Sequence, residues 1–354
     1  MGIVEEKVAE LKKYRPKLTK QEDFEDFWQL AIEELFPGET GSASWKINVE
    51  SQKILEEYKV RFDLELEEYP YPLKHIKVYK ATIEASDGTI LHGWYLSPVE
   101  AGSDNKVPAL VRFHGYSSNK GKICELLLWA LQGYAILAMD VRGQCGDTPD
   151  PREYTSGSFS GWMTLGLDSP MEYYYRQVYL DSIQTIEALV RRPEVDSTKI
   201  GLFGNSQGAA LAIISSALIT RFKDRVGGIT ARIAGINAGV PFLTDMQRAY
   251  KEHTDGPWAE FDWYFRMHDP LHEKEDEIFT YLSYFDAMNF APWVNSPVLL
   301  AVGLKDTVCP PPTSFALYNH LAGKKEIMVY PDYGHESIDS HVDKQISFFA
   351  SLLL

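Results

Sequence analysis

Six short apolar runs mark the chain from residue 109 onward, and each ends in glycine, aspartate or asparagine. The runs are ALVRFHG, YAILAMD, KIGLFGN, RIAGINAG, PVLLAVG and EIMVYPD. Unbroken apolar runs of about five to seven residues are typical of strands that are covered on both faces of a sheet. The pattern therefore predicts a sheet buried between layers of helices.

Helical periods separate these apolar runs. We expect helices over residues 122–131, 173–191, 207–221 and 341–354. In the second range, apolar residues recur at steps of three and four, which is the period of one buried helix face. They are Tyr175, Tyr179, Ile183, Ile186 and Val190. Strands and helices in alternation predict an α/β protein with a doubly wound, mostly parallel sheet.

Two further patterns precede this alternation. Residues 76–85 and 89–98 predict two antiparallel strands that are joined by an Asp87-Gly88 turn. Residues 21–35 predict an acidic amphipathic helix, whose apolar face holds Phe24, Phe27, Trp28, Ala31 and Leu35. We expect residues 1–70 to be an N-terminal extension that packs on the core, with a polar loop at 37–51.

The segment 241–292 interrupts the alternation of strands and helices. It lies between two predicted strands and is dense in aromatic residues, as in WAEFDWYFRMHDP and IFTYLSYFDAM. A connection of about fifty residues is too long for a plain loop, so we expect a helical cap inserted over the edge of the sheet. Residues 1–354 then form a single domain that carries this insertion.

Composition supports a large core and narrows the expected partners. The 354 residues are 45% hydrophobic and 13% aromatic, and the formal net charge is -15. Phosphate backbones and anionic lipids repel such a chain, so nucleic acid and membranes are not expected partners. The sequence shows no apolar run of about 18 residues and no apolar signal-peptide core near its start, which predicts a cytoplasmic protein.

The cysteines and histidines do not predict a metal site. Cys124, Cys145 and Cys309 are too few and too scattered for a disulfide framework or a zinc cage. His268 and His272 lack the His-Glu-x-x-His pattern of a zinc helix. We expect neither a metal nor an organic cofactor.

The stretch LFGNSQGAA places one serine between two glycines, after a predicted strand and before a predicted helix. In this G-x-S-x-G arrangement a sharp turn presents a nucleophile, here Ser206. Without Cβ atoms, Gly204 and Gly208 let the strand and the helix approach closely while the serine takes a strained conformation. Taken alone, the motif also fits a tight turn with no chemistry.

A nucleophilic serine needs a base, and the base needs an acid that orients it. In this type of fold the chain order is serine, then Asp or Glu, then histidine, on loops after later strands. Asp306 follows the run PVLLAVG, and His335 follows the run EIMVYPD. The order and the positions at strand ends predict a Ser206-Asp306-His335 triad.

Other residues compete for these roles. Asp332 and Glu336 are close to His335 in sequence, but residues of one loop rarely face the imidazole in triad geometry, so Asp306 is preferred. His114 follows a strand too early in the chain order. The other histidines that could be considered as the base are His268, His272, His320 and His341, which we expect to be surface or core residues.

Acyl transfer also needs N–H donors that point at the developing oxyanion. One donor is expected to be the backbone N–H of Gln207, the residue after the nucleophile. The other is expected in the loop RFHGYSSNKG, at the N–H of Tyr116. The helix that begins near Gln207 directs its positive dipole end at the same site. The alternative is that the His-Gly-Tyr sequence of this loop is only a turn.

The sequence contains four separated motifs, namely DVRGQCGD, GNSQG, LKDTVCPP and YGHES. Together they resemble the cephalosporin-C deacetylase and acetyl xylan esterase family, carbohydrate esterase family seven. Linking stretches such as GWMTLGL and YYYRQVYLD agree, so the resemblance extends over nearly all of the chain. It implies an α/β-hydrolase fold.

The resemblance also implies a function and an assembly. It implies a serine esterase that removes O-acetyl groups from small substrates such as acetylated xylo-oligosaccharides and cephalosporin C. It implies a homo-oligomer, a ring-like hexamer whose sites open to an interior cavity. In this family the RGQ motif supports the catalytic loop, so Arg142, Gly143, Gln144 and also Glu336 are expected to support the site.

The chain departs from the family pattern in places. Asn205 and Ala209 stand where the family often has glycine, and Cys145 and Asp147 follow the RGQ motif where small residues are common. Extra residues at roughly 37–67 could change the contacts between subunits.

Several alternatives keep the same fold. A general short-chain carboxylesterase or a thioesterase would use the same triad on other acyl groups. A serine peptidase of the prolyl-oligopeptidase type usually carries a β-propeller, for which the residues before position 76 are too few. A non-catalytic binding protein usually loses a triad member, whereas Ser206, Asp306 and His335 are all present.

Overall fold

The computed structural model describes residues 2–36, 62–155 and 161–354. The loop expected at 37–51 lies outside the described residues. The strands of the described part are β1 (Glu65–Glu68), β2 (Ile76–Glu84), β3 (Ile90–Pro98), β4 (Val107–Phe113), β5 (Ala135–Met139), β6 (Val195–Asn205), β7 (Ile233–Gly239), β8 (Val298–Gly303) and β9 (Lys325–Tyr330). The last six coincide with the six apolar runs.

These strands form one sheet in the order β1-β2-β3-β5-β4-β6-β7-β8-β9. The pairs from β1 to β5 are antiparallel, and the pairs from β5 through β4 to β9 are parallel. Every residue of β5 and β8 is buried, whereas β9 at the sheet edge is only half-buried. The predicted α/β-hydrolase fold with a mostly parallel sheet is confirmed.

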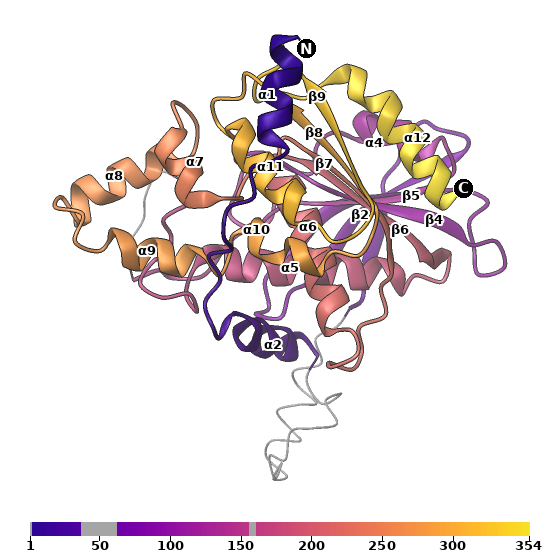
Figure 1. Ribbon diagram of the computed structural model, residues 1–354. Coiled ribbons are helices and arrows are strands. Elements are labelled where there is room, and N and C mark those ends of the chain that lie inside the picture. Colours follow the sequence, from indigo (N-terminus) through magenta and orange to yellow (C-terminus); the bar gives the residue numbers. More distant parts are fainter. Residues whose placement is uncertain (1, 37–61, 156–160) are drawn as a thin grey trace, which may run out of the picture.

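The helices cover both faces of this sheet (Figure 1). They are α1 (Ile3–Leu11), α2 (Phe24–Leu35), α4 (Ile123–Ala130), α5 (Tyr174–Val190), α6 (Gln207–Phe222), α7 (Met246–Glu252), α8 (Ala259–His268), α9 (Glu275–Leu282), α10 (Ala287–Phe290), α11 (Pro311–His320) and α12 (Val342–Leu353), with 3-10 turns at Ala291–Trp293 and Asp339–His341. One core packs α4 and α12 on the sheet through Trp129 and Phe349, and the other holds α5, α6 and α11. No helix in the described ranges has the length and apolar character needed to cross a bilayer.

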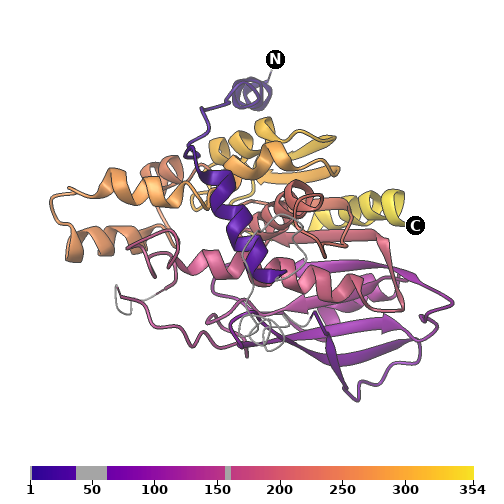
Figure 2. The same ribbon diagram turned by 90° about the horizontal axis from the view of Figure 1, so that it is seen from below.

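The predicted amphipathic helix is α2, which packs on α5 and α6 (Figure 2). Phe24 and Trp28 of its apolar face are buried, and the Trp28 indole N–H donates to the Tyr284 carbonyl oxygen at 2.9 Å. The N-terminal segment therefore lies on the same face of the sheet as the helix that follows Ser206.

Residues 241–292 contain α7 to α10, and α7, α8 and α9 project away from the sheet (Figures 1 and 2). The buried carboxylate of Asp286 joins the two ends of this cap. It accepts the N–H groups of Asp245 (2.9 Å) and Met246 (2.8 Å) at the start of α7, and that of Met288 (2.9 Å) in α10. Burial and the nearby Asp245 carboxylate raise the pKa of Asp286 to about 7.

Candidate active site

Ser206 occupies the turn between β6 and α6, with φ 57° and ψ -121°. This φ lies in a region that residues with a side chain rarely adopt, so the turn is strained. A Cβ atom on Gly208 would lie 2.1 Å from the Phe113 carbonyl oxygen, and one on Gly204 would lie 2.5 Å from it. The two glycines therefore allow β6 and α6 to press against the end of β4, which presents the serine at the carboxyl end of β6, a central strand of the sheet.

His335 connects Ser206 to Asp306. The Ser206 hydroxyl donates to His335 Nε2 at 3.0 Å, and His335 Nδ1–H donates to Asp306 Oδ2 at 2.9 Å. The other carboxylate oxygen, Oδ1, accepts the N–H groups of Val308 (2.9 Å) and Cys309 (2.7 Å). The Asp306 side chain is 1% exposed, and these three donors fix the orientation of its carboxylate.

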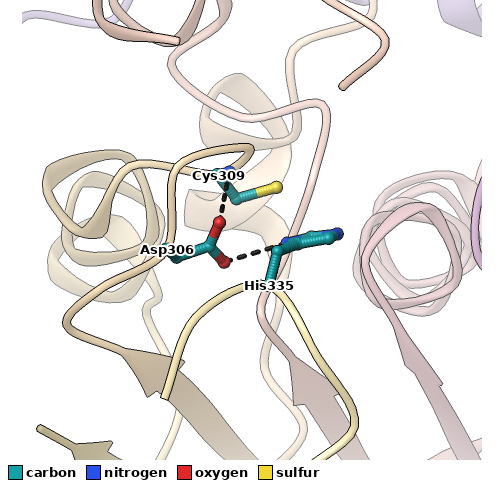
Figure 3. A group of neighbouring side chains, drawn as sticks. All are labelled: Asp306, Cys309 and His335. Atoms are coloured by element: carbon teal, nitrogen blue, oxygen red, sulfur yellow. Dashed lines mark hydrogen bonds and ion pairs between the residues drawn. The ribbon is translucent and has the colours of Figure 1, made fainter. Parts of the chain in front are cut away.

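Asp306, Cys309 and His335 also form a cluster of potential metal ligands, with ligand atoms within 4.8 Å of one another (Figure 3). Two of these atoms, on Asp306 and His335, are already hydrogen-bonded to each other. Burial and the charge of Asp306 raise the pKa of the Cys309 thiol well above its ordinary value, and metals bind the thiolate. The donor set is therefore poorly suited to a resident metal, and the Asp306 carboxylate is better described as the group that orients the His335 imidazole.

The residues that competed for the roles of acid and base interact with partners other than Ser206, Asp306 and His335. The Asp332 side chain is 83% exposed and pairs with Lys305 at 2.6 Å. The exposed Glu336 carboxylate accepts the Gly334 N–H at 3.1 Å, so it supports its own loop. The His341 ring forms hydrogen bonds with the side chains of Asn237 and Tyr330, and not with Ser206.

His114 is a buried neutral imidazole that fixes the neighbouring loop. Its Nε2 accepts the Val141 N–H at 2.8 Å, so the proton is on Nδ1, which donates to the Gly115 carbonyl oxygen at 2.8 Å. Burial lowers the pKa of His114 to about 4. The residue ties the loop after β4 to the segment that follows β5.

The two expected oxyanion donors lie beside the nucleophile. A Cβ atom on Gly115 would be 3.8 Å from Ser206 Cβ, so the loop that carries Tyr116 contacts the serine turn. Neither the Tyr116 N–H nor the Gln207 N–H donates to another residue in the described part of the chain. Both N–H groups are therefore free of protein acceptors in this part of the chain and are candidates for the oxyanion hole.

The Gln207 side chain is fully buried and joins the nucleophile turn to the RGQ segment. Its Oε1 accepts from Gln144 Nε2 and from the Tyr175 hydroxyl, each at 2.8 Å. Gln144 Nε2 also donates to the Tyr174 hydroxyl at 3.2 Å. Gln144 therefore contacts the residue after the nucleophile, whereas its neighbours in the motif act at a greater distance.

Arg142 is completely buried and lies among carboxylates. It binds Asp181 and Asp87, each with a shortest N–O distance of 2.6 Å, and it lies 3.5 Å from Asp150. An isolated buried guanidinium would be costly, and breaking a buried pair typically costs about 3–5 kcal/mol. Gly143 follows with φ 67°, and its carbonyl oxygen accepts the Trp162 indole N–H at 2.9 Å. Arg142 and Gly143 therefore hold the shape of the loop and do not contact the triad.

A cavity of about 670 Å³ opens at Ser206 and His335. Its walls come from the core and the cap, and they include Tyr116, Val240, Gly256, Pro257 and Val308. Three residues of this lining, Ser117, Ser206 and Val240, have positive φ without being glycine. Strained backbone tends to gather at functional sites.

Two further residues near this cavity, Asn205 and Glu260, connect distant segments of the chain. Asn205 Nδ2 donates to Ser337 Oγ at 3.2 Å, which joins the serine turn to the histidine loop. Glu260 of α8 accepts the hydroxyl of Tyr116 at 2.5 Å. Both contacts join segments more than 100 residues apart, so no local motif indicates them.

Known proteins resemble the chain along most of its length. The family model for acetyl xylan esterase (AXE1) matches residues 42–353. The solved acetyl xylan esterase from Paenibacillus sp. R4 is 38% identical, with a TM-score of 0.85 and 100% of each chain covered. Acetyl xylan esterase 1 from Thermoanaerobacterium sp. JW/SL YS485 is 33% identical, with a TM-score of 0.82 and 99% of each chain covered.

A relative with a longer chain is acetyl esterase Axe7A of Xylanibacter ruminicola. It is 25% identical over 326 residues, which are 91% of this chain, and the match spans 65% of the length of Axe7A. The family model itself matches well over half of the chain, and the two solved esterases exceed 30% identity over all or nearly all of it. The chain therefore belongs to the acetyl xylan esterase (AXE1) family.

Proposed function

We propose that the protein is a serine esterase that removes O-acetyl groups from small substrates such as acetylated xylo-oligosaccharides and cephalosporin C. The observation that carries the proposal is the hydrogen-bond chain from Ser206 through His335 to Asp306 at a strained turn. Membership of the acetyl xylan esterase family supports acetyl as the acyl group.

In the first half-reaction, His335 Nε2 accepts the Ser206 proton while Oγ attacks the acetyl carbonyl carbon. Asp306 holds the proton on His335 Nδ1 and stabilises the imidazolium. The N–H groups of Tyr116 and Gln207 stabilise the oxyanion of the tetrahedral intermediate. His335 then protonates the leaving alcohol, and acetyl-Ser206 remains.

In the second half-reaction, His335 Nε2 removes a proton from a water molecule that attacks acetyl-Ser206. The same two N–H groups stabilise the second tetrahedral intermediate. When it collapses, acetic acid leaves and ionises to acetate, and the proton on His335 returns to Ser206 Oγ. The residues of this chain therefore complete the cycle without a cofactor.

The cap provides a reason for a short acyl pocket. Trp258 Nε1 donates to the Val308 carbonyl oxygen at 3.0 Å, which binds the cap to the loop that carries Asp306. Val308 and Pro257 then face the cavity near the serine, together with Val240. We propose that these apolar side chains limit the acyl group to acetyl or slightly longer chains.

We expect kcat/KM for p-nitrophenyl acetate to exceed that for the butyrate ester by at least about tenfold. Each methylene that does not fit an apolar pocket costs about 1–3 kcal/mol. The measurement is a panel of acetate, butyrate and octanoate p-nitrophenyl esters, acetylated xylo-oligosaccharides, an acetyl thioester and aminoacyl p-nitroanilides. Heat-inactivated protein gives the background rate for each substrate.

The same panel separates the alternatives. Equal rates for acetate and octanoate would replace the proposal with a general carboxylesterase, and faster thioester cleavage would indicate a thioesterase. Faster cleavage of the anilides would indicate a peptidase. No turnover of any substrate would favour a binding protein on this fold.

We propose further that the protein is a cytoplasmic homo-oligomer, with the hexamer of the family as the expected state. The resemblance in the four motifs supports the assembly. The few, scattered cysteines and the lack of an Asn-x-Ser/Thr glycosylation motif in this sequence support the compartment. We expect light scattering to give six times the 40.2 kDa mass of one chain. A mass of 40.2 kDa in dilute solution would contradict the hexamer.

A further inference from the structure

Glu260 of the cap binds the side chain of Tyr116, the residue whose backbone N–H is assigned to the oxyanion hole. The Tyr116 hydroxyl donates to Glu260 Oε1 at 2.5 Å, and the Trp162 N–H donates to the same phenol oxygen at 2.6 Å. The second carboxylate oxygen, Oε2, accepts the Met163 N–H at 2.9 Å. The Glu260 carboxylate thus joins α8 to the segment around Trp162 and to the loop after β4 that carries Tyr116.

The backbone around Gly161 packs closely against this carboxylate. A Cβ atom on Gly161, which has φ 129°, would lie 2.1 Å from the Glu260 carboxylate. Burial raises the pKa of Glu260, and the hydrogen bonds from Tyr116 and the Met163 N–H oppose this rise because they favour the charged form. The half-buried carboxylate is therefore compensated by donors aimed at it.

The Tyr116 ring itself is held by other aromatic side chains. It contacts Trp162 and Phe242 edge-on, with centroid distances of 5.3 and 6.0 Å. The hydroxyl is fixed by Glu260 at one end and the ring is fixed along its length, so the whole side chain has one position. Because the side chain and the backbone N–H share one Cα atom, this position restricts the direction of the N–H.

The backbone of this loop needs such support. Tyr116 lies outside the strands and helices, and Ser117 beside it has φ 50°. A strained residue persists only where its surroundings over-determine its conformation. An oxyanion donor must also be held within about 0.5 Å and 10–20° of its productive geometry.

We propose that Glu260 is a positioning residue for acyl transfer: it binds the Tyr116 phenol and thereby holds the Tyr116 N–H in the direction that stabilises the oxyanion. The cap is then a part of the catalytic apparatus as well as a wall of the cavity. This inference rests on the proposed function, since it concerns the same serine, but it does not depend on which acyl group the enzyme accepts.

Replacing Glu260 with alanine tests this role. Removal of one oxyanion donor costs about 100- to 1000-fold in rate, so a donor that is displaced but present is expected to cost about 10- to 100-fold in kcat. KM is expected to stay within about threefold of wild type, because the donor acts mainly in the transition state. Glu260→Gln keeps the size and one acceptor, and its kcat is expected to be intermediate.

Asp262→Ala is the matched control. Asp262 lies two residues further along α8, its carboxylate also accepts a tyrosine hydroxyl, that of Tyr250 at 3.1 Å, and its side chain is 56% exposed. We expect kcat of Asp262→Ala within about twofold of wild type, in line with surface substitutions. A fall as large as that of Glu260→Ala would assign both effects to the stability of α8 and overturn the proposal.

Tyr116→Phe approaches the same contact from the other side. It is expected to lower kcat by a similar factor, and the double variant Tyr116→Phe/Glu260→Ala is expected to fall no further, because both changes remove one interaction. Additive losses would mean that Glu260 acts by another route and would overturn the proposal. This pair also protects the test if Glu260→Ala folds poorly.

A second reaction separates this inference from the proposed function. Paraoxon phosphorylates a reactive serine: the Ser206 Oγ–P bond forms, p-nitrophenolate leaves and the serine proton passes to His335. The reaction uses the oxyanion donors but transfers no acyl group, so we expect its rate constant to fall in Glu260→Ala by the same factor as kcat. If the wild-type protein showed no acetylesterase activity but reacted with paraoxon faster than Glu260→Ala, the inference would stand and the proposed function would be refuted. Wild-type kcat and phosphorylation rates in Glu260→Ala would refute the inference alone.

Discussion

Replacing Ser206 with alanine is expected to lower kcat for acetate esters by about 10⁶-fold, the size associated with loss of a catalytic serine. The hydroxyl that disappears is the one bonded to His335 Nε2 at 3.0 Å. The backbone of the turn is expected to persist, because the Ser206 N–H donates to the Gly239 carbonyl oxygen and its carbonyl oxygen accepts the Phe242 N–H. Steady-state kinetics with p-nitrophenyl acetate measure the effect, and thermal melting checks the fold.

Ser216→Ala provides the matched control for this variant. Ser216 lies on the same helix, α6, and its buried hydroxyl has no hydrogen-bond partner among the described residues. Removing it is expected to leave kcat near wild type. If Ser206→Ala kept more than about one hundredth of wild-type kcat, a loss below about 3 kcal/mol in the barrier, Ser206 would not be the nucleophile.

The sheet could be predicted from sequence because burial on both faces demands unbroken apolar runs. Strands β5 and β8 are fully buried, and their runs AILAM and VLLAVG contain no charged residue. Strand β1, with the sequence ELEE, was missed because an exposed edge strand needs no apolar residues and is defined only by its pairing with β2. Helix α11 was missed because it begins with two prolines, which sequence analysis takes as loop signals although they fit the first turn of a helix.

The hydrogen-bonded set of Ser206, His335 and Asp306 could be predicted because each member follows a recognisable strand. The contacts that position these three residues could not be predicted, because they join side chains from distant segments of the chain. Glu260 is an ordinary acidic residue of an amphipathic helix until the fold brings it to Tyr116. Asn205, an unexplained residue in the sequence motif, proves to bind Ser337 in the histidine loop. Tertiary geometry, rather than local pattern, decides which polar residues support a site.

Replacing Asp306 with asparagine is expected to lower kcat by about 10⁴-fold. The N–H groups of Val308 and Cys309 both donate to Asp306 Oδ1, so an asparagine must place its amide oxygen there. Its NH₂ group then faces His335 Nδ1 and needs an acceptor at that nitrogen. The imidazole is thereby driven to carry its proton on Nε2, where it cannot accept the proton of Ser206.

Asp332→Asn distinguishes this tautomer effect from a general loss of negative charge near His335. Asp332 lies three residues before the histidine, but its side chain is 83% exposed and pairs with Lys305. An exposed ion pair contributes about 0–1 kcal/mol, so kcat of this variant is expected within about twofold of wild type. Near-normal turnover of Asp306→Asn with loss of turnover in Asp332→Asn would exchange the two assignments. Loss in both variants would mean that charge near His335, rather than the donor pattern at Oδ1, limits catalysis.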